Sequence, residues 1–359
     1  MTTDIPTNWC KLEDDFRHKR SVILFLGTGV NYGGPRNFSW DALINHLLKY
    51  AVQLVFPHGS NFDNIVRALE STEITEDVFT QEVSQRFPRD VKTTIIKQTL
   101  GNASYVKLIQ HFLYGKCGNG VIKAAGKQYV DYLNNPISDL PSFHTLFRLA
   151  DMILRNRNIR AVVTQNYDQF LCEAILFLKT NDAYRDYLRE HKLAVNGKPR
   201  DITPHSICDW KQQTDFGYDN INIYHVHGFI PRYEEIQAPL DNKIVLSMDE
   251  FYEDSRNVYT WQIASQLHFL SQYTCIFCGL SLEDYTNQRL LHYVKGKHQG
   301  NIYYITAKTS FTGKYVEERQ IMDEVKNKFH EKNGLKVIYD REGFGHIYKL
   351  LGELVYGNN

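Results

Sequence analysis

The feature that most constrains the fold is a continuous apolar segment, Ser21–Leu26, that runs directly into Gly27-Thr28-Gly29. Such an uninterrupted run is typical of a strand buried on both faces, as the strands of parallel sheets are. A helix is expected next, because Asp41–Phe56 has apolar residues at helical spacing and Ser39 is placed to cap its start. A strand, a glycine loop and a helix in this order predict an α/β fold.

The same alternation returns in the second half of the chain. We expect strands at Ile159–Thr164, Ile221–His225, Lys243–Leu246, Tyr273–Cys278, Asn301–Thr306 and Leu335–Tyr339, and helices near His144–Asn156, Ser247–Leu270, Glu283–Lys295 and Lys314–Lys332. This pattern predicts a Rossmann-like α/β fold with a mostly parallel sheet covered by helices on both faces. Ligands of such sheets bind beyond the carboxyl ends of the strands.

A different pattern occupies residues 57 to 141, approximately. Charged segments with helical spacing dominate there, and they carry no chemical motif. We therefore interpret residues 1–359 as a single domain with a helical insertion at about 57–141. The insertion and the high aromatic content, 13%, make self-association plausible.

Charge and composition narrow the classes of partner and compartment. Lys and Arg total 41, as do Asp and Glu, so net charge gives no reason to expect nucleic acid or an anionic membrane as the main ligand. The N-terminal segment is too polar for a signal peptide, and no apolar run reaches the about 18 residues that a membrane helix needs. The six cysteines are scattered, and a chain of this size needs no disulfides. We expect a reducing, cytoplasmic compartment.

Three motifs follow predicted strands, and each has a structural alternative. In the first, the glycines at 27 and 29 would let the backbone approach a phosphate. Tyr32 occupies the third glycine position of the dinucleotide fingerprint, and no Gly-Lys-Ser/Thr follows, so a tight structural turn remains an alternative.

The second motif is Thr164-Gln165-Asn166-Tyr167-Asp168, directly after an apolar strand. Two amides and a carboxylate at a strand end can grip a ribose and orient a water molecule. The alternative is that Asp168 caps the next helix.

The third motif is His225-Val226-His227-Gly228, where His227 is a candidate general base. A structural histidine is the main alternative. The two histidines could also share a metal, but no third ligand lies near them in the sequence. Cys275 and Cys278 have zinc spacing without a second Cys or His pair, so we interpret them as core thiols.

Together, and in this order, the motifs resemble the sirtuin-like superfamily. Gly27-Thr28-Gly29-Val30-Asn31 is similar to its nicotinamide-dinucleotide loop, and Gly34-Pro35 and Ser39-Trp40 are similar to the residues that follow it. Thr164–Asp168 resembles the family's Thr-Gln-Asn-x-Asp motif, and His227-Gly228 resembles its catalytic His-Gly. Gly279-Leu280-Ser281 resembles the Gly-x-Ser motif that comes later in the family's sequences. The resemblance extends over roughly Ser21 to Thr306.

The departures from the pattern indicate a subtype. Position 28 is Thr instead of Ala, and position 31 is Asn instead of Ser. Sirtuin deacylases carry two Cys-x-x-Cys pairs after the catalytic histidine, whereas Phe229–Thr274 contains no cysteine. The chain therefore resembles the bacterial sirtuin-like proteins of anti-phage defence. That resemblance implies cleavage of NAD to nicotinamide and ADP-ribose, and assembly into oligomers or with a sensor or ATPase partner.

The resemblance also implies a role for each motif residue, with NAD as substrate and no metal. Asn166 would orient the ribose or the attacking water, Asp168 would hold the carboxamide side or stabilise positive charge, and His227 would be the general base. The cofactor-binding residues would be Gly27, Thr28, Gly29, Asn31, Pro35, Gln165, Gly279 and Ser281. Tyr32, Arg36 and Phe38 are candidates to close over the nicotinamide, or else belong to a structural loop.

Two other functions stay open from the sequence. One is a protein deacylase or ADP-ribosyl transferase that uses the same cofactor, against which the missing cysteines count. The other is a sensor that binds NAD or ADP-ribose without cleaving it, against which the pair Asn166 and His227 counts.

Overall fold

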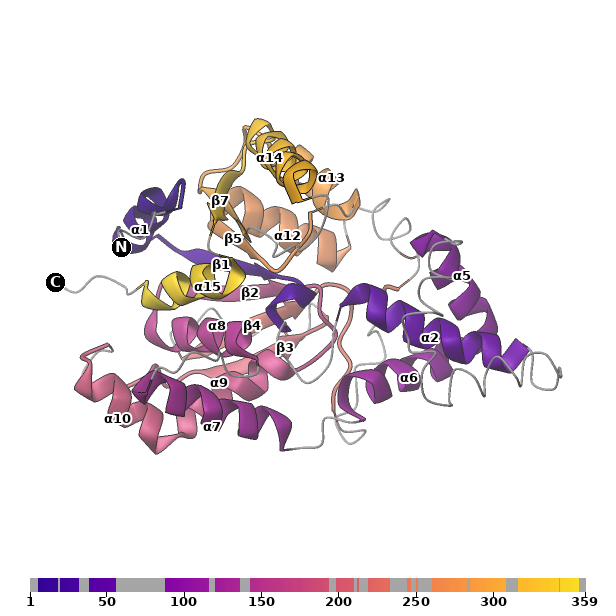
Figure 1. Cartoon of the computed structure of the whole chain (residues 1–359), viewed down its shortest axis with the longest axis horizontal. Coiled ribbons are helices and arrows are strands. Elements are labelled where there is room, and N and C mark those ends of the chain that lie inside the picture. Colours follow the sequence, from indigo (N-terminus) through magenta and orange to yellow (C-terminus); the bar gives the residue numbers. More distant parts are fainter. Residues whose placement is uncertain are drawn as a thin grey trace.

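The computed structural model describes residues 6–18, 20–31, 39–55, 88–115, 120–135, 143–193, 198–209, 212, 219–232, 244–246, 250, 260–282, 285–307, 316–341 and 343–354. Within them, the central element is a seven-stranded parallel sheet of order β3-β4-β2-β1-β5-β6-β7 (Figure 1). The strands are β1 (Val22–Leu26), β2 (Ile159–Thr164), β3 (Thr203–Ile207), β4 (Asn220–His225), β5 (Thr274–Cys278), β6 (Ile302–Ala307) and β7 (Lys336–Asp340).

The first strand lies at the centre of the sheet, and all five of its residues are buried, as the apolar run predicts. The chain crosses from β1 to β2 on one side and later returns to β5 on the other. This makes β1 the switch point, beside which α/β sheets bind their ligands. Leu26 pairs with Thr164 and with Cys278, so the loops after β1, β2 and β5 leave the sheet at the same edge.

Helices cover both faces of the sheet (Figure 1). Leu24 and Leu26 enter one core with α8, whereas Ile23 and Phe25 enter the other with α12, because neighbouring strand residues point to opposite faces. On the first face lie α1 (Trp9–Arg17), α7 (Val121–Asn134), α8 (His144–Arg155), α9 (Phe170–Thr180), α10 (Asp182–Glu190) and α15 (Phe344–Glu353). On the second lie α12 (Trp261–Gln272), α13 (Tyr285–Val294) and α14 (Val316–Lys332).

Three further helices form a cap beyond the carboxyl ends of the strands (Figure 1). They are α2 (Trp40–Val55), α5 (Arg89–Leu100) and α6 (Asn102–Tyr114), which pack on one another. Ser39 caps α2 as predicted, since its hydroxyl accepts a hydrogen bond from the Ala42 amide at 3.2 Å. Helix α7, although it comes from the same predicted insertion, packs on α9 and α10 in the helical layer. The segment 56–87 lies outside the described residues.

The structure corrects two strand predictions. Residues 244–246 form no strand, although Val245 donates its amide to the carbonyl of His227 at 2.9 Å. Conversely, β3 at the sheet edge was not predicted, because Thr203-Pro204-His205-Ser206 is polar and only half covered. Of the helix predicted at Ser247–Leu270, the described part begins at Trp261.

The two cysteines with zinc spacing lie in β5 and face opposite sides of the sheet. Cys275 belongs to the core with α12, and Cys278 to the core with α8. Positions i and i+3 of a strand diverge in this way, so the two thiols cannot share a metal and are core residues, as interpreted. No helix in the described parts of the chain is both long and apolar enough to cross a membrane.

Candidate functional site

The loops after β1 and β5 contact each other through their backbones. The Gly27 amide donates to the carbonyl of Cys278 and the Gly29 amide to that of Gly279, each at 3.0 Å. A Cβ atom on Gly27 would lie 2.5 Å from the Gly279 oxygen, and one on Gly279 would lie 2.6 Å from the Val30 nitrogen. These glycines thus allow two loops to pack at a distance that no side chain permits. A diphosphate held by the Gly27 and Gly29 amides would have to share these bonds.

The loop after β2 presents side chains instead. The Asn166 amide donates to the Thr164 hydroxyl at 3.0 Å, and Asn166 Nδ2 donates to the Gly27 carbonyl at 3.2 Å. Asn166 is buried, yet within the described structure nothing donates to its Oδ1. An unsatisfied buried acceptor costs about 1–3 kcal/mol, so native proteins leave few without a purpose. The side chain of Asn166 is thus fixed by its Nδ2, while its Oδ1 can accept a hydrogen bond from a ligand.

Asp168 accepts a hydrogen bond from the first residue of a helix and has a carboxyl of altered acidity. Its Oδ1 accepts from the Phe170 amide at 3.0 Å at the start of α9, and its Oδ2 accepts from Asn31 Nδ2 at 2.9 Å. Burial raises the pKa of Asp168 to about 6, although the hydrogen bonds from Phe170 and Asn31 oppose that shift. Asp168 is therefore ionised at neutral pH but close to its titration range. The predicted Asx-type bond is present, although the N-cap position itself is Gln169, and the Asp168 carboxylate lies beside Asn166.

His225 supports this loop from behind. Its Nδ1 lies 2.9 Å from the carbonyl oxygen of Asn166, and its Nε2 lies 3.2 Å from the Ser206 hydroxyl. Because a carbonyl only accepts, Nδ1 carries the proton and Ser206 donates to Nε2. Burial lowers the pKa of His225 to about 4, which keeps the ring neutral. With both nitrogens engaged by the protein, His225 is a positioning residue, and it could bind a metal only by giving up those bonds.

His227 has a different environment. It is buried, and its ring lies edge-on to the indole of Trp40, with centroids 6.3 Å apart. Trp40 also packs edge-on against Tyr167 at 5.4 Å. The Tyr167 hydroxyl donates to the Val245 carbonyl at 2.5 Å, which ties segment 244–246 to the loop after β2. The ring of His227 is thus adjacent to the aromatic wall of the pocket described next.

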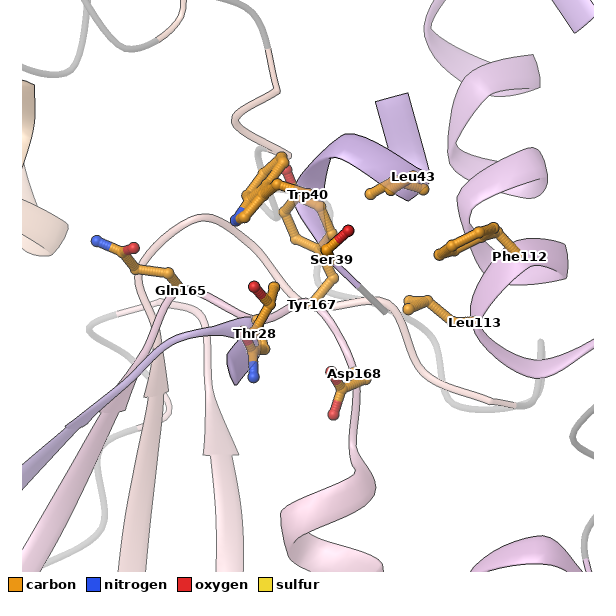
Figure 2. Close-up of a pocket in the computed structure, with 10 residues that line it drawn as sticks. Thr28, Ser39, Trp40, Leu43, Phe112, Leu113, Gln165, Tyr167 and Asp168 are labelled. Carbon is orange, nitrogen blue, oxygen red and sulfur yellow. The ribbon is translucent and has the colours of Figure 1, made fainter. Parts of the chain in front are cut away.

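A pocket lies between the cap and the sheet edge (Figure 2). In the view of Figure 2, Trp40 lies above Thr28, Phe112 and Leu113 project from α6, and Asp168 lies below. Its lining consists of Thr28, Ser39, Trp40, Leu43, Phe112, Leu113, Gln165, Asn166, Tyr167 and Asp168. A second hollow shares Asn166 and Asp168 and extends to Asn31 and His225. Asn166 and Asp168 therefore stand between two cavities.

The remaining predicted residues are distributed as follows. Gln165 lines the pocket, and its Nε2 donates to Asn287 Oδ1 on α13 at 2.9 Å. Ser281 is exposed on the loop after β5, next to Gly279. Pro35 lies outside the described residues, as do Tyr32, Arg36 and Phe38.

Sequence reasoning missed two contributions to this site. Phe112 and Leu113 come from the predicted insertion, whose helical spacing does not reveal which side faces a pocket. His225 was considered only beside His227 as a possible metal ligand, whereas its contacts are with Asn166 and Ser206. Its position as the last residue of a buried strand was the available signal.

Residues 160–338 match the family model of the SIR2-like domain. Over these residues the chain is similar to the SIR2-like domain. The match begins in β2 and ends in β7, so it contains the loop of Asn166, His227 and the loop after β5, and it leaves out β1 and the cap. SIR2-like proteins are NAD-dependent enzymes, which agrees with a pocket at the switch point of a Rossmann-like sheet. No curated protein matches the chain.

Proposed function

We propose that this sirtuin-like protein is an NAD glycohydrolase, which cleaves NAD to nicotinamide and ADP-ribose. The observation that carries the proposal is the open Oδ1 of Asn166, buried in the pocket next to an Asp168 carboxyl with a pKa of about 6. An acceptor in this position can bind a ribose hydroxyl or the attacking water. A carboxylate beside it can stabilise positive charge on the ribose.

The pocket suits one half of the dinucleotide. The aromatic side chains of Trp40, Tyr167 and Phe112 provide a surface for the nicotinamide ring, and Asn166 and Asp168 provide the polar contacts. We therefore place nicotinamide and its ribose here, and the rest of NAD along the loops after β1 and β5.

The proposed reaction breaks the bond between the ribose C1′ and the nicotinamide nitrogen. The bonding electrons pass to the pyridinium nitrogen, so nicotinamide leaves neutral and C1′ gains positive character, as in other glycoside hydrolyses. Asp168 stabilises that charge and Asn166 orients the water through its Oδ1. His227 accepts the proton that the water loses as its oxygen bonds to C1′. NAD and water thus give nicotinamide, ADP-ribose and one proton.

The biological role that we propose rests on the resemblance of the motifs. Bacterial sirtuin-like proteins of anti-phage defence deplete NAD on infection, and we assign this chain the same role of toxic effector in the cytoplasm. Free activity would harm the host, so we expect restraint by an oligomeric state or by a separate sensor or ATPase partner.

Nicotinamide release from NAD by the purified protein tests the proposal, with and without extract of infected cells. We expect His227→Ala to lower the rate at least about 100-fold, as loss of a general base does. The matched control is His205→Ala on the edge strand β3, whose ring lies 3.1 Å from Asn220 Oδ1, whereas the ring of His227 packs against Trp40 of the pocket. Wild-type turnover in His227→Ala would contradict the assignment.

The same assay separates the alternatives. Release that requires an acyl-lysine peptide would identify a deacylase. NAD binding without release, in every condition, would identify a sensor. Release that needs only NAD and water supports the glycohydrolase.

A further inference from the structure

Helix α14 presents four apolar residues to solvent, and its covered side carries the polar residues Asp323, Asn327 and His330. Ile321, Met322, Val325 and Phe329 are 60%, 55%, 55% and 52% exposed. On the opposite side of the helix, His330 is buried with its ring 5.0 Å from that of Tyr304. This is the reverse of an ordinary surface helix, whose apolar side faces the core. An outward apolar face of this kind is typical of an interaction surface.

The four apolar residues, which we call the α14 stripe, lie on one side of the helix. Ile321, Val325 and Phe329 follow each other at intervals of four, and Met322 lies beside them. Glu318 continues the same side about one turn before the stripe, and Lys332 continues it about one turn after. Both of these charged residues are exposed. The stripe is therefore apolar in the middle, acidic at one end and basic at the other.

We propose that the α14 stripe is a homodimer interface in which two copies of α14 pack antiparallel about a two-fold axis at Val325. The positions of two residue pairs are symmetric about Val325, because Ile321 and Phe329 are four positions from it and Glu318 and Lys332 are seven. Met322 has Lys328 at its symmetric position, so its contact is with the methylene stem of that lysine. Antiparallel packing sets Ile321 against Phe329 of the partner subunit and Glu318 against Lys332 of the partner subunit. A two-fold interface has to be self-complementary in this sense.

Charge determines both the direction and the occupant. A parallel pair would place Glu318 opposite the same glutamate of the other copy and Lys332 opposite the same lysine, and like charges across an interface are unfavourable. An unrelated partner has no reason to match a stripe that is complementary to itself, so we commit to a second copy of this chain. Four side chains on one helix cover less than the about 800 Å² per partner of a standard interface. The dimer is accordingly weak and depends on concentration.

Sedimentation velocity of the full chain, over a wide range of protein concentration, measures this association. We expect a reversible monomer–dimer equilibrium in the wild type. Val325→Asp places two carboxylates at the axis and should raise the dissociation constant at least about tenfold. The matched control is Leu176→Asp on α9. It also replaces an exposed apolar side chain by a carboxylate, since Leu176 is 44% exposed, but it lies away from the stripe. It should leave the dissociation constant unchanged, and circular dichroism confirms that both variants are folded.

A charge exchange tests the antiparallel arrangement itself. Glu318→Lys should weaken the dimer, and the double variant Glu318→Lys/Lys332→Glu should restore it, because both ends then exchange sign together. In a background with the exposed Cys10 replaced by Ser, Val325→Cys should cross-link to its own copy on oxidation, whereas Ile321→Cys should not. A monomeric wild type at every concentration overturns the proposal. So does a dimer that Val325→Asp leaves intact, or a single charge reversal that the second reversal does not rescue.

Discussion

The loops after β1 and β2 leave the sheet side by side but serve the site in different ways. The loop after β1 is built from backbone contacts, since Gly27 and Gly29 donate to the loop after β5 at distances that exclude a side chain. The loop after β2 is built from side chains, since Asn166 and Asp168 form its hydrogen bonds and line the pocket. The glycines of the motif that resembles a phosphate loop are thus explained by the packing of the loops after β1 and β5. The candidate reactive side chains lie on the loop after β2.

The largest effect that we predict concerns the backbone contact between loops. Gly279 has a φ of 66°, and a Cβ there would lie 2.6 Å from the Val30 nitrogen. Gly279→Ala should lower the free energy of unfolding by about 3 kcal/mol or more, from overpacking together with the strained φ. Gly296 has a similar φ of 71° but open space around it.

Gly296→Ala is therefore the matched control, and it should cost only the about 1–2 kcal/mol of the left-handed conformation. Urea unfolding of the two variants measures the difference. Equal losses would show that the contact between the loops after β1 and β5 contributes nothing beyond backbone strain.

The next effect concerns the Asp168 carboxyl. Burial raises its pKa from 3.8 to about 6, so folding favours the protonated form. That contribution to stability is complete below pH 3.8 and is lost as the pH rises through about 6, a change of about 3 kcal/mol. Asp168→Asn cannot ionise, so its free energy of unfolding relative to wild type should rise by up to that amount between pH 4 and pH 7.

Unfolding of both proteins across this pH range measures the change. Asp131→Asn, which removes an exposed carboxylate from α7, controls for the loss of one charge. A difference between Asp168→Asn and wild type that does not vary with pH would contradict the shifted pKa.

The smallest effect concerns the support behind Asn166. Ser206→Ala removes the donor to Nε2 of the buried His225 and should cost about 1–2 kcal/mol of stability, since that acceptor is left unsatisfied. The bond from His225 to the Asn166 carbonyl remains, so turnover should fall less than about tenfold. Ser271→Ala, whose hydroxyl donates to the Leu267 carbonyl within α12, is the control.

Urea unfolding and nicotinamide release measure these two quantities. The lowered pKa of His225 adds a pH dependence to the wild type, because its contribution to stability is present above pH 6.5 and lost as the pH falls through about 4. A turnover loss in Ser206→Ala as large as that of a lost general base would give Ser206 a more direct role than support.

Much of the fold followed from the sequence because the buried strands are continuous apolar runs. Strands β1, β2, β4, β5, β6 and β7 agree with the predicted segments to within a residue or so. Edge strand β3 was not predicted, because its half-covered polar residues give no periodic hydrophobic pattern. The strand predicted at Lys243–Leu246 was wrong for the opposite reason, since residues 244–246 are apolar and buried but do not pair with a strand of the sheet. The local sequence pattern therefore predicts which residues are buried, but it does not predict which segments pair as strands.

The site was predictable in its chemistry and less so in its contacts. Asn166 and Asp168 follow a strand whose position in the sheet brings them to the pocket, and parallel strand ends gather at one edge. The contact of Gly29 with Gly279 depends on a loop about 250 residues away in the sequence, so no local pattern encodes it. The same holds for Phe112, which reaches the pocket only through the packing of α6 on α2.

The most direct test of the central claim is the effect of Asn166→Ala on NAD binding and on nicotinamide release, measured side by side in the condition that activates the wild type. If the open Oδ1 of Asn166 orients the reacting groups, release should fall at least about 100-fold while NAD affinity changes less than about tenfold. Release at the wild-type rate would contradict the account, because the open acceptor of Asn166 would then have no part in the reaction.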